Sequence, residues 1–524
     1  MWDNIVQAPE KTRPGIEPLP RDQQSKEILS VARGGGIAFV GAFTTRALSY
    51  IYSLVLIRSL GAESFGLYTL ALAIITLVGL IADLGLVQGV VRYGAIQSHA
   101  KGRAGTHKVT IVALQIVVPA SLLFMFTLFF GANYLAILFS KPDLGPLIKS
   151  MGISIPFMSI QALLLASTRS LKIIKYSVIV WVVQPLCALL LAMLFIFCKL
   201  GILGVSFAYS ISTILGACLA SYFYLRLMIN ARKSDEKFSL SQMVKFSLPV
   251  SINSWVDFAN QRSEIYFLGF LSSAIDVGIY NISWRLAGLE TILIESLNQL
   301  FGPFTSELSY QHKIKKLGEL YKTQAKWGFS FALVLFLIYI LFGADIMSIF
   351  DATFVRGTTV LIMIGLAQLI NAITGPCGTV LLMSGHSGLS LLNTIILLVS
   401  SILLDWILIL NHGLTGAAWA GLLTIVLVNI LRVAEVWIIL KIHPFRWDLI
   451  KPLIAGISSF GAVYILRAFF PTDSLLIDLL WIILFILFYI IILIFLKINQ
   501  EDKMVITAIQ QKIFGSKKKP DIVY

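Results

Sequence analysis

Charged residues are scarce in this sequence. Asp, Glu, Lys and Arg together make up 13% of the 524 residues, whereas hydrophobic residues make up 57%. Average soluble domains carry about 25% charged residues, so a large soluble domain is excluded. The strands of a membrane β-barrel alternate over about 10 residues, and unbroken apolar runs such as residues 481–496 do not fit that pattern. We therefore expect an all-α polytopic membrane protein, because helices satisfy their own backbone hydrogen bonds in lipid.

Sequence signals of several other protein classes are missing. The four cysteines lie in apolar runs, and no two of them have metal-type CxxC spacing. The first 30 residues are polar and proline-rich without an apolar core, so we expect no cleavable signal peptide. The chain has no GxxxxGK(S/T) phosphate loop and no HExxH or GxSxG motif. We expect neither ATP hydrolysis nor a metal or catalytic site, so the protein is predicted not to be an enzyme.

Hydropathy predicts about fourteen spans, because each span needs about 20 mostly apolar residues. Numbered 1 to 14 in chain order, they are placed at 34–57, 65–90, 109–131, 147–167, 176–198, 201–225, 247–271, 278–302, 327–343, 358–383, 388–410, 414–440, 452–470 and 475–496.

The positive charges are unevenly divided between the two predicted sides. If the N-terminus is inside, 31 of the 41 Lys and Arg residues fall on the inner side. The outer side holds six, which are Arg58, Lys141, Lys149, Lys199, Arg356 and Arg467. The positive-inside rule then places both termini in the cytoplasm. The net charge of +14 therefore reflects topology and contact with anionic membrane lipid, and we do not expect nucleic acid as a partner.

The chain contains a weak internal repeat at an offset of 212 residues. Gly66 and Tyr68 match Gly278 and Tyr280, and GILGVSFA at 201–208 falls on GLTGAAWA at 413–420. Each half has six spans, so the chain returns to its starting side after the first half. Both halves therefore enter the membrane from the same side. Transporters with such parallel repeats bind substrate between the halves, which favours alternating access.

The repeat also predicts the domain organisation. The expected parts are a cytoplasmic N-terminal segment (1–33), an N-lobe (34–230), a cytoplasmic linker (231–246), a C-lobe (247–441), two additional spans (442–498) and a basic cytoplasmic tail (499–524).

Charged residues at bilayer depth are costly and mark a transport pathway or a paired structural site. Span 1 carries Arg46, span 7 carries Arg262, and span 8 carries Arg285. Helical spacing predicts one polar face on span 7, formed by Asn253, Asp257, Gln261 and Glu264. Spans 1, 7 and 8 are therefore expected to share a polar seam that does not face lipid.

Two interpretations of the three arginines remain open. Guanidinium groups suit phosphate, because they stay charged and offer a planar fork of donors. Alternatively, Arg46, Arg262 and Arg285 pair with acids of spans 7 and 8 (Asp257, Glu264 and Glu290) and hold the helices together. The first interpretation is favoured for Arg46, which has no acid within its own span.

Two further acids stand at corresponding positions of the two halves. Asp83 and Glu295 match at the repeat offset, near the predicted inner ends of spans 2 and 8. We expect them to be gate or structural contacts to basic cytoplasmic residues.

Three stretches resemble a known family. LIRSLGAESFGLYTLALAIITLVGLIADLGL at 56–86, followed by RYGA at 92–95, resembles the first signature of the polysaccharide biosynthesis or oligosaccharide flippase family. FLGFLSSAIDVGIYNISWRLAGLE at 267–290 and FGPFTSELS at 301–309 resemble its second-half signature, and GLTGAAWAG at 413–421 resembles its span 12 start. The family belongs to the multidrug/oligosaccharidyl-lipid/polysaccharide exporter superfamily, which has twelve or fourteen helices in two lobes.

The resemblance implies a flippase that moves a polyprenyl-diphosphate-linked oligosaccharide from the cytoplasmic to the outer leaflet of the cell inner membrane. It implies that Arg46 and Arg285 meet the diphosphate. It also implies a cation site, for Na⁺ or H⁺, that involves spans 7 and 11, with Asp257 and Asp405 as candidates. Glu264 is a further candidate because it shares the predicted polar face of span 7.

Other functions remain possible at this stage. A drug or cation antiporter of the same superfamily is the main alternative, and a membrane polymerase or ligase of surface glycans is a weaker one. A glycan polymerase and glycosyltransferases are possible protein partners of a flippase.

Overall fold

The computed structural model describes residues 21–229, 240–470 and 474–496, and in these ranges the chain is helical with no strand. Residues 1–20 of the predicted N-terminal segment, residues 230–239 with most of the predicted linker, and the predicted tail (499–524) lie outside the described residues. The predicted all-α class is confirmed.

The helices follow one another along the chain with short connections. They are α1 (Arg21–Ala82), α2 (Leu86–Lys101), α3 (Arg103–Leu138), α4 (Leu144–Gly152), α5 (Ile155–Ser170), α6 (Lys175–Phe197), α7 (Gly201–Met228), α8 (Leu240–Gln261), α9 (Ser263–Leu271), α10 (Ala274–Ala287), η1 (Gly288–Glu290), α11 (Thr291–Tyr310), α12 (Ile314–Ser348), η2 (Ala352–Gly357), α13 (Thr358–Thr374), α14 (Cys377–Met383), α15 (Ser387–Leu440), η3 (Trp447–Leu449), α16 (Ile450–Phe469) and α17 (Leu475–Phe495).

Nine helices of the described chain are long and apolar enough to cross a membrane, or ten if the bent pair α4 and α5 forms one span. Two of the nine are too long for a single crossing, because the 43 residues of α1 from Val40 and the 54 residues of α15 rise about 65 and 80 Å, respectively. Each is interrupted by a glycine with positive φ, Gly61 at 83° and Gly413 at 54°. Each of these helices therefore supplies two of the predicted spans.

Predicted spans 7 and 8 are both broken helices. Span 7 consists of α8 and α9, separated at Arg262, which has φ −125° and ψ 8°. Span 8 consists of α10 and α11, separated by η1. The break at Arg262 interrupts the helical repeat between Asp257 and Glu264, on which the single polar face predicted for span 7 depends.

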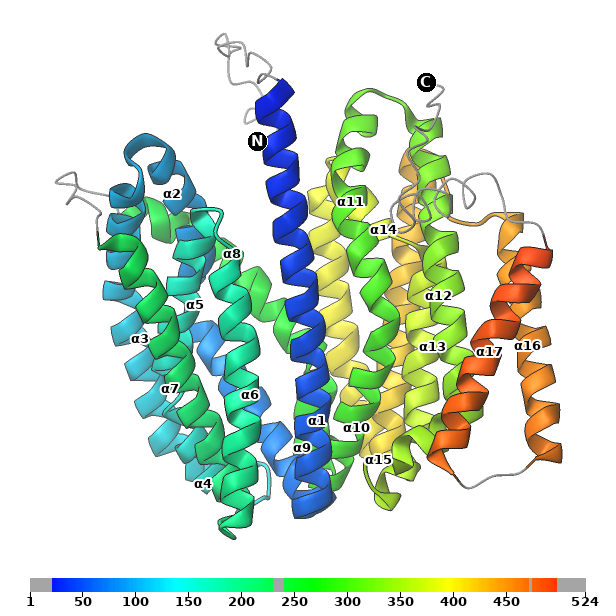
Figure 1. Ribbon diagram of the computed structural model, residues 1–524, viewed down its shortest axis with the longest axis horizontal. Coiled ribbons are helices and arrows are strands. Elements are labelled where there is room, and N and C mark those ends of the chain that lie inside the picture. Colours follow the sequence, from blue (N-terminus) through cyan, green and yellow to red (C-terminus); the bar gives the residue numbers. More distant parts are fainter. Residues whose placement is uncertain (1–20, 230–239, 471–473, 497–524) are drawn as a thin grey trace.

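Figure 1 shows two helical bundles side by side, with α1 between them. Helices α2 to α7 lie in one bundle and α10 to α15 in the other, and α16 and α17 lie beyond α12 and α13. α8 packs on α2 and α1, and its buried Met243 belongs to an apolar cluster with Leu86, Val90 and Val109. α8 thus packs mainly on helices of the N-lobe and to a lesser extent on α15, whereas α9 packs mainly on α15 of the C-lobe.

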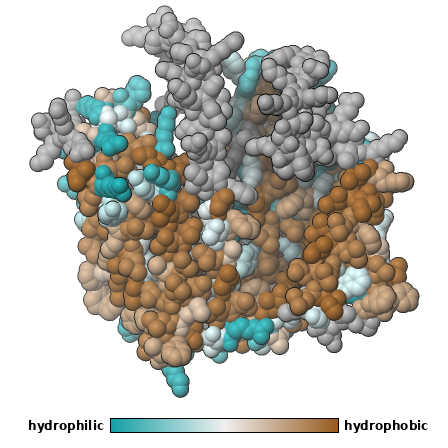
Figure 2. Space-filling view, in the orientation of Figure 1, coloured by the Kyte–Doolittle hydropathy of each residue, from teal (hydrophilic) through white to brown (hydrophobic). Residues whose placement is uncertain are grey.

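The outer surface of the described chain is suited to lipid. On the face shown in Figure 2, hydrophobic side chains form a broad band, with hydrophilic side chains near its upper and lower edges. Large apolar side chains of the described chain are exposed, including Phe130 at 78%, Phe197 at 85% and Phe495 at 85%. Soluble monomers rarely expose apolar patches of this extent, so the protein is a multi-pass membrane protein.

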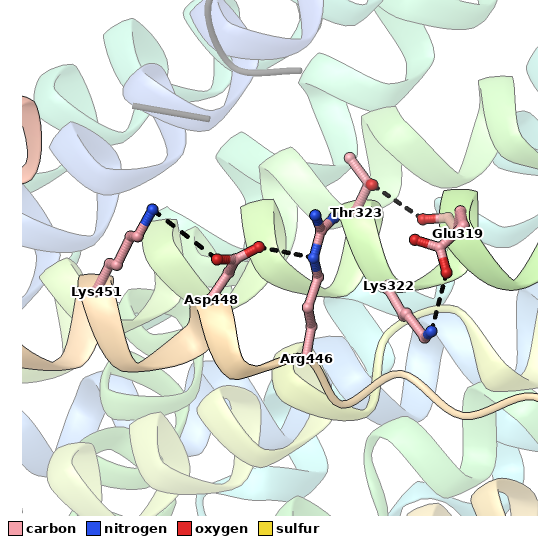
Figure 3. A network of polar contacts seen from close by, with 6 residues as sticks. All are labelled: Glu319, Lys322, Thr323, Arg446, Asp448 and Lys451. Carbon is pink, nitrogen blue, oxygen red and sulfur yellow. Dashed lines mark hydrogen bonds and ion pairs between the residues drawn. The ribbon is translucent and has the colours of Figure 1, made fainter. Parts of the chain in front are cut away.

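Charged side chains lie at both ends of α16. Before α16, Arg446 donates to Asp448 at 2.6 Å, close to Thr323 and to the Lys322–Glu319 pair of α12 (Figure 3). At the other end, Arg467 forms an ion pair with Asp345 of α12 at 2.6 Å. Arg467 also pairs with Asp478 of α17 at 3.4 Å, so it joins both helices beyond the repeat to α12.

Candidate functional site

The three predicted arginines line two cavities between the bundles. The C-lobe cavity has a volume of about 540 Å³ and is lined by all three, Arg46, Arg262 and Arg285. The N-lobe cavity has a volume of about 390 Å³ and shares Ser49, Arg262 and Arg285 with the first. Both volumes lie within the usual range of small-molecule sites, about 300–1,000 Å³.

Arg285 of α10 reaches across to the first segment of α1. Its Nη1 donates to Ser53 Oγ at 2.7 Å, and its guanidinium carbon lies 5.0 Å from the ring centre of Tyr50. The Tyr50 hydroxyl donates to the Arg285 carbonyl at 2.7 Å. A guanidinium group has five N–H donors, and the described residues use one of these. Arg285 is thus held by neutral groups and keeps donors for an anion.

Arg262 lies at the break between α8 and α9. Its Nη1 donates to Asn281 Oδ1 at 3.3 Å, and its guanidinium carbon lies 4.6 Å from the Trp284 ring centre. Within the described ranges, neither Arg262 nor Arg285 forms an ion pair, so the alternative in which they pair with acids of spans 7 and 8 is not what the structure contains. Cation–π contacts hold both guanidinium groups in place without a carboxylate in direct contact.

Arg46 has a different partner from the one expected. Its Nη2 lies 3.6 Å from Oε2 of Glu295, and both side chains are exposed to the cavity. Glu295 was predicted to contact basic cytoplasmic residues, whereas its partner is an arginine of span 1. The pair joins α1 to α11 across the C-lobe cavity. An exposed pair of this kind contributes about 0–1 kcal/mol, so an incoming anion can replace Glu295 at low cost.

Two of the three predicted ion-coupling acids lie together. Ser263 of α9 and Ser401 of α15 share a hydrogen bond of 2.8 Å. The Ser263 hydroxyl also lies 3.3 Å from Oε2 of Glu264, and the Ser401 hydroxyl lies 3.3 Å from Oδ2 of Asp405. Asp405 is fully buried, and its Oδ1 has no hydrogen-bond partner in the described chain. Oxygen ligands of this kind suit a hard cation or a proton.

Asp257 lies apart from this cluster. Its Oδ2 accepts a hydrogen bond from Asn253 of the same helix at 3.1 Å, and no contact in the described structure joins it to Glu264 or Asp405. The described residues contain no group of three or more His, Cys, Asp or Glu that could hold a metal ion.

Two other acids have buried carboxyl oxygens that lack a hydrogen-bond partner among the described residues. Asp83, between α1 and α2, is half-buried, and its Oδ1 has no such partner, so it does not share the environment of Glu295. Glu290 of η1 is fully buried, and neither of its carboxyl oxygens has a hydrogen-bond partner among the described residues. It does not pair with an arginine.

The sequence interpretation missed the uncharged polar wall of the N-lobe cavity. Tyr52, Tyr68, Gln184 and Tyr209 lie in this wall, within runs that read as apolar. A signal was available on span 1, where Ser49, Tyr52 and Ser53 have the i, i+3, i+4 spacing of one helical face.

The family signature covers the first half of this architecture. The family model described as polysaccharide biosynthesis protein matches residues 31–308, which is more than half of the chain. The chain belongs to the polysaccharide biosynthesis protein family. The sequence resemblance to this family is therefore confirmed.

Two curated relatives come from Haloferax volcanii. The chain is 24% identical over 199 residues to "Probable low-salt glycan biosynthesis flippase Agl15" and 26% identical over 191 residues to "Probable flippase AglR". These matches cover 37% and 34% of this chain, and 41% and 39% of the relatives. The chain thus matches about two fifths of the length of each relative.

Solved structures of transporters share the fold. A lipid II flippase, MurJ, in an inward closed conformation has a TM-score of 0.71 at 14% identity, over 91% of this chain and 99% of the other. An inward-facing multidrug resistance transporter of the MATE family has a TM-score of 0.64 at 16% identity, over 76% and 94%. The two curated relatives and these two structural neighbours are named as flippases or transporters.

Proposed function

We propose that this protein is a flippase that carries a polyprenyl-diphosphate-linked oligosaccharide from the cytoplasmic to the outer leaflet. The observation that carries the proposal is the pair Arg262 and Arg285, which lines both cavities and is held by neutral groups. A diphosphate that leaves water needs paired cations, because a buried, unpaired charge costs several kcal/mol. The names of the two curated relatives agree with a lipid-linked glycan substrate.

The proposed site separates the two ends of the substrate. The arginines bind the diphosphate between the lobes while the polyprenyl tail stays in lipid along the exposed apolar surface. Arg46 adds a third cation when the diphosphate displaces Glu295 from its 3.6 Å contact. The lobes then rock about the bound headgroup, as expected for a parallel repeat.

We propose the orientation and partners from the sequence. The protein would lie in the inner membrane of the cell. The excess of Lys and Arg on one side then places both termini in the cytoplasm. Glycosyltransferases would supply the substrate on that side, and a glycan polymerase would use it on the other.

We also propose that an ion gradient drives transport through Glu264 and Asp405. The two serines join these acids across the α9–α15 contact, so binding of Na⁺ or H⁺ would strengthen that contact. Glu264 also lines the C-lobe cavity with Arg262. Ion binding at Glu264 would therefore act directly on the cavity that holds the substrate. Asp257 remains a candidate by its charge alone.

An antiporter of organic cations fits this cavity less well. Arg46, Arg262 and Arg285 face the space that a cationic drug would occupy. With Glu264 and Glu295 also in the lining, the arginines still leave an excess of positive charge, so the cavity favours an anion over a cation.

The proposal can be tested in proteoliposomes. The probe is a fluorescent short-chain polyprenyl diphosphate that carries N-acetylglucosamine, and its exposure to a membrane-impermeant quencher is followed in time. Separate replacement of Arg46, Arg262 and Arg285 by alanine should each lower the initial rate by about tenfold or more, as expected when a hydrogen bond to a charged group is lost.

A matched control is Arg226→Ala, since Arg226 is exposed on α7 and lines neither cavity. Its rate should equal that of the wild type. Wild-type rates in all three cavity variants would place the headgroup site elsewhere, and a wild-type rate no faster than that of protein-free vesicles would overturn the flippase assignment.

A further inference from the structure

The N-lobe cavity has a polar wall of a distinct kind. Its hydrogen-bonding groups are hydroxyls and amides, for example Ser49, Thr76, Gln184 and Ser212. The described lining contains no Asp, Glu, Lys or His, and its charged groups are Arg262 and Arg285, on the side shared with the C-lobe cavity. Away from those two arginines, this wall offers donors and acceptors but no charge.

A chain of amides fixes part of this wall. Gln161 of α5 donates to Gln184 of α6 at 2.7 Å, and Gln184 donates to Thr213 of α7 at 3.2 Å. A methyl group at Gly216 would lie 2.6 Å from Gln161 Oε1 and 3.2 Å from Gln184 Oε1, so glycine leaves the space that both amides occupy. Gln161 Oε1 is itself buried and has no donor in the described chain.

Aromatic rings form the adjoining part of the wall. Tyr52 and Tyr68 lie with ring centres 5.9 Å apart, and the Tyr52 hydroxyl donates to the Tyr68 hydroxyl at 3.2 Å. Tyr209 and Phe65 line the same cavity. Rings of this type offer an apolar face together with a polar edge. A pyranose presents the same combination, with C–H groups on its faces and hydroxyls around its rim.

We propose that the N-lobe cavity binds the uncharged sugar residue attached directly to the diphosphate. This inference rests on the proposed function, because the shared arginines must hold the diphosphate for the first sugar to reach this wall. The amides and tyrosine hydroxyls meet the sugar hydroxyls, and the rings cover its faces. With Arg262 and Arg285 occupied by the diphosphate, a uronic acid would bury a carboxylate without a cation, so the site selects against it.

The test is equilibrium binding to the purified full-length protein in nanodiscs. Three probes share one short prenyl chain: the diphosphate without sugar, the diphosphate with N-acetylglucosamine, and the diphosphate with glucuronic acid. The wild type should bind the N-acetylglucosamine probe about tenfold more tightly than either of the others, since each satisfied hydrogen bond adds selectivity.

Gln184→Leu should remove the preference for N-acetylglucosamine and leave the affinity for the sugar-free probe unchanged. Tyr52→Phe removes one hydroxyl with little change of shape, and it should reduce the preference without changing sugar-free binding. This second variant keeps the test decisive if Gln184→Leu does not fold. Gln311→Leu is the matched control, because Gln311 is exposed and bonds to Glu307 of α11 away from both cavities.

The outcomes separate this inference from the proposed function. If the wild type binds none of the probes, the flippase assignment fails. If it binds all three equally, or if the folded Gln184 and Tyr52 variants keep the full preference for N-acetylglucosamine, the diphosphate site stands and the sugar subsite is overturned. Arg285→Ala should weaken all three probes alike.

Discussion

Arg285 donates to a serine, and Arg262 donates to an asparagine, although acids are present nearby in the sequence. A guanidinium bound to neutral groups is kept in place without losing its net charge, whereas an ion pair would neutralise it. Arg262 reaches Asn281 from the break between α8 and α9, and Arg285 reaches Ser53 of α1 from α10, so both guanidinium groups contact neutral side chains. The type and approximate depth of these residues could be predicted from the sequence, but their partners could not, because partner choice depends on tertiary contacts.

Arg285→Lys tests the geometry of the phosphate contact separately from its charge. Lysine keeps the positive charge but loses the planar fork and stacks less well on Tyr50. In the proteoliposome assay we expect a rate between those of the wild type and Arg285→Ala. A lysine variant as fast as the wild type would mean that charge alone suffices, which would contradict bidentate binding.

Asp405→Asn tests ion coupling at residue scale. Asparagine nearly preserves the shape of the side chain and its hydrogen bond from Ser401, but it removes the charge that would bind a cation or a proton. We expect normal probe binding and a transport rate that no longer responds to an imposed Na⁺ or H⁺ gradient. Glu264→Gln should behave in the same way. Asp257→Asn should retain gradient dependence, and loss of dependence in Asp257→Asn alone would move the ion site to α8.

Hydropathy predicted where the chain crosses the membrane, but not where the helices break. Periodicity arguments assume an unbroken helix, and this assumption failed between Asp257 and Glu264. The same break separates the packing of the two halves of span 7, because α8 lies on α2 and α9 lies on α15. A domain boundary that is placed by counting spans cannot show that the two halves of one span pack on different lobes.

The repeat glycines have a role that their spacing did not reveal. A methyl group at Gly66 would overlap the carbonyl oxygen of Ala274, and one at Gly278 would lie 3.1 Å from Phe65 and 3.3 Å from the Ala62 carbonyl oxygen. Gly66 and Gly278 therefore allow the second segment of α1 and α10 to cross with their backbones close together. Small residues at helix crossings are a recurrent device of membrane proteins.

Gly66→Ala should destabilise this crossing. The added methyl group meets backbone, which cannot move as a side chain can, and overpacking of this kind costs about 1–3 kcal/mol. We expect a lower thermal midpoint of the detergent-solubilised protein and lower membrane abundance. Gly131→Ala is the matched control, because a methyl group there meets nothing within 4 Å. An equal effect of the two variants would contradict close packing at Gly66.

At the scale of the whole molecule, the lobes are joined most closely at the side where α1 bends. The largest apolar cluster there contains Phe65 and Tyr68 of the N-lobe together with Tyr280 and Phe354 of the C-lobe. Figure 1 shows α1 beginning at the upper face and reaching the lower face, so this contact lies on the side opposite the beginning of α1. By the proposed orientation this is the outer side.

Two basic residues of the N-lobe close the same side. Arg58 donates to the Ile349 carbonyl at 2.7 Å, just beyond the end of α12. Lys141 donates to the carbonyls of Gly269 at 2.6 Å and Ser272 at 2.9 Å, at the end of α9. Cations at helix C-termini are favourable because they satisfy free carbonyls and the helix dipole. Both contacts must break before the lobes can separate on this side.

Replacing Arg58 and Lys141 together by alanine should favour the conformation that is open on this side. Each contact contributes about 0.3–1 kcal/mol, so the loss of both should shift the equilibrium by about three- to thirtyfold. Spin labels at Lys199→Cys and Asn411→Cys, both exposed and on different lobes, report the separation in a protein whose four native cysteines are replaced by alanine. Electron–electron double resonance should show a larger population of long distances in the double variant. The same labels with Arg226→Ala should give the wild-type distribution, and an unchanged distribution in the double variant would mean that the apolar cluster alone keeps this side closed.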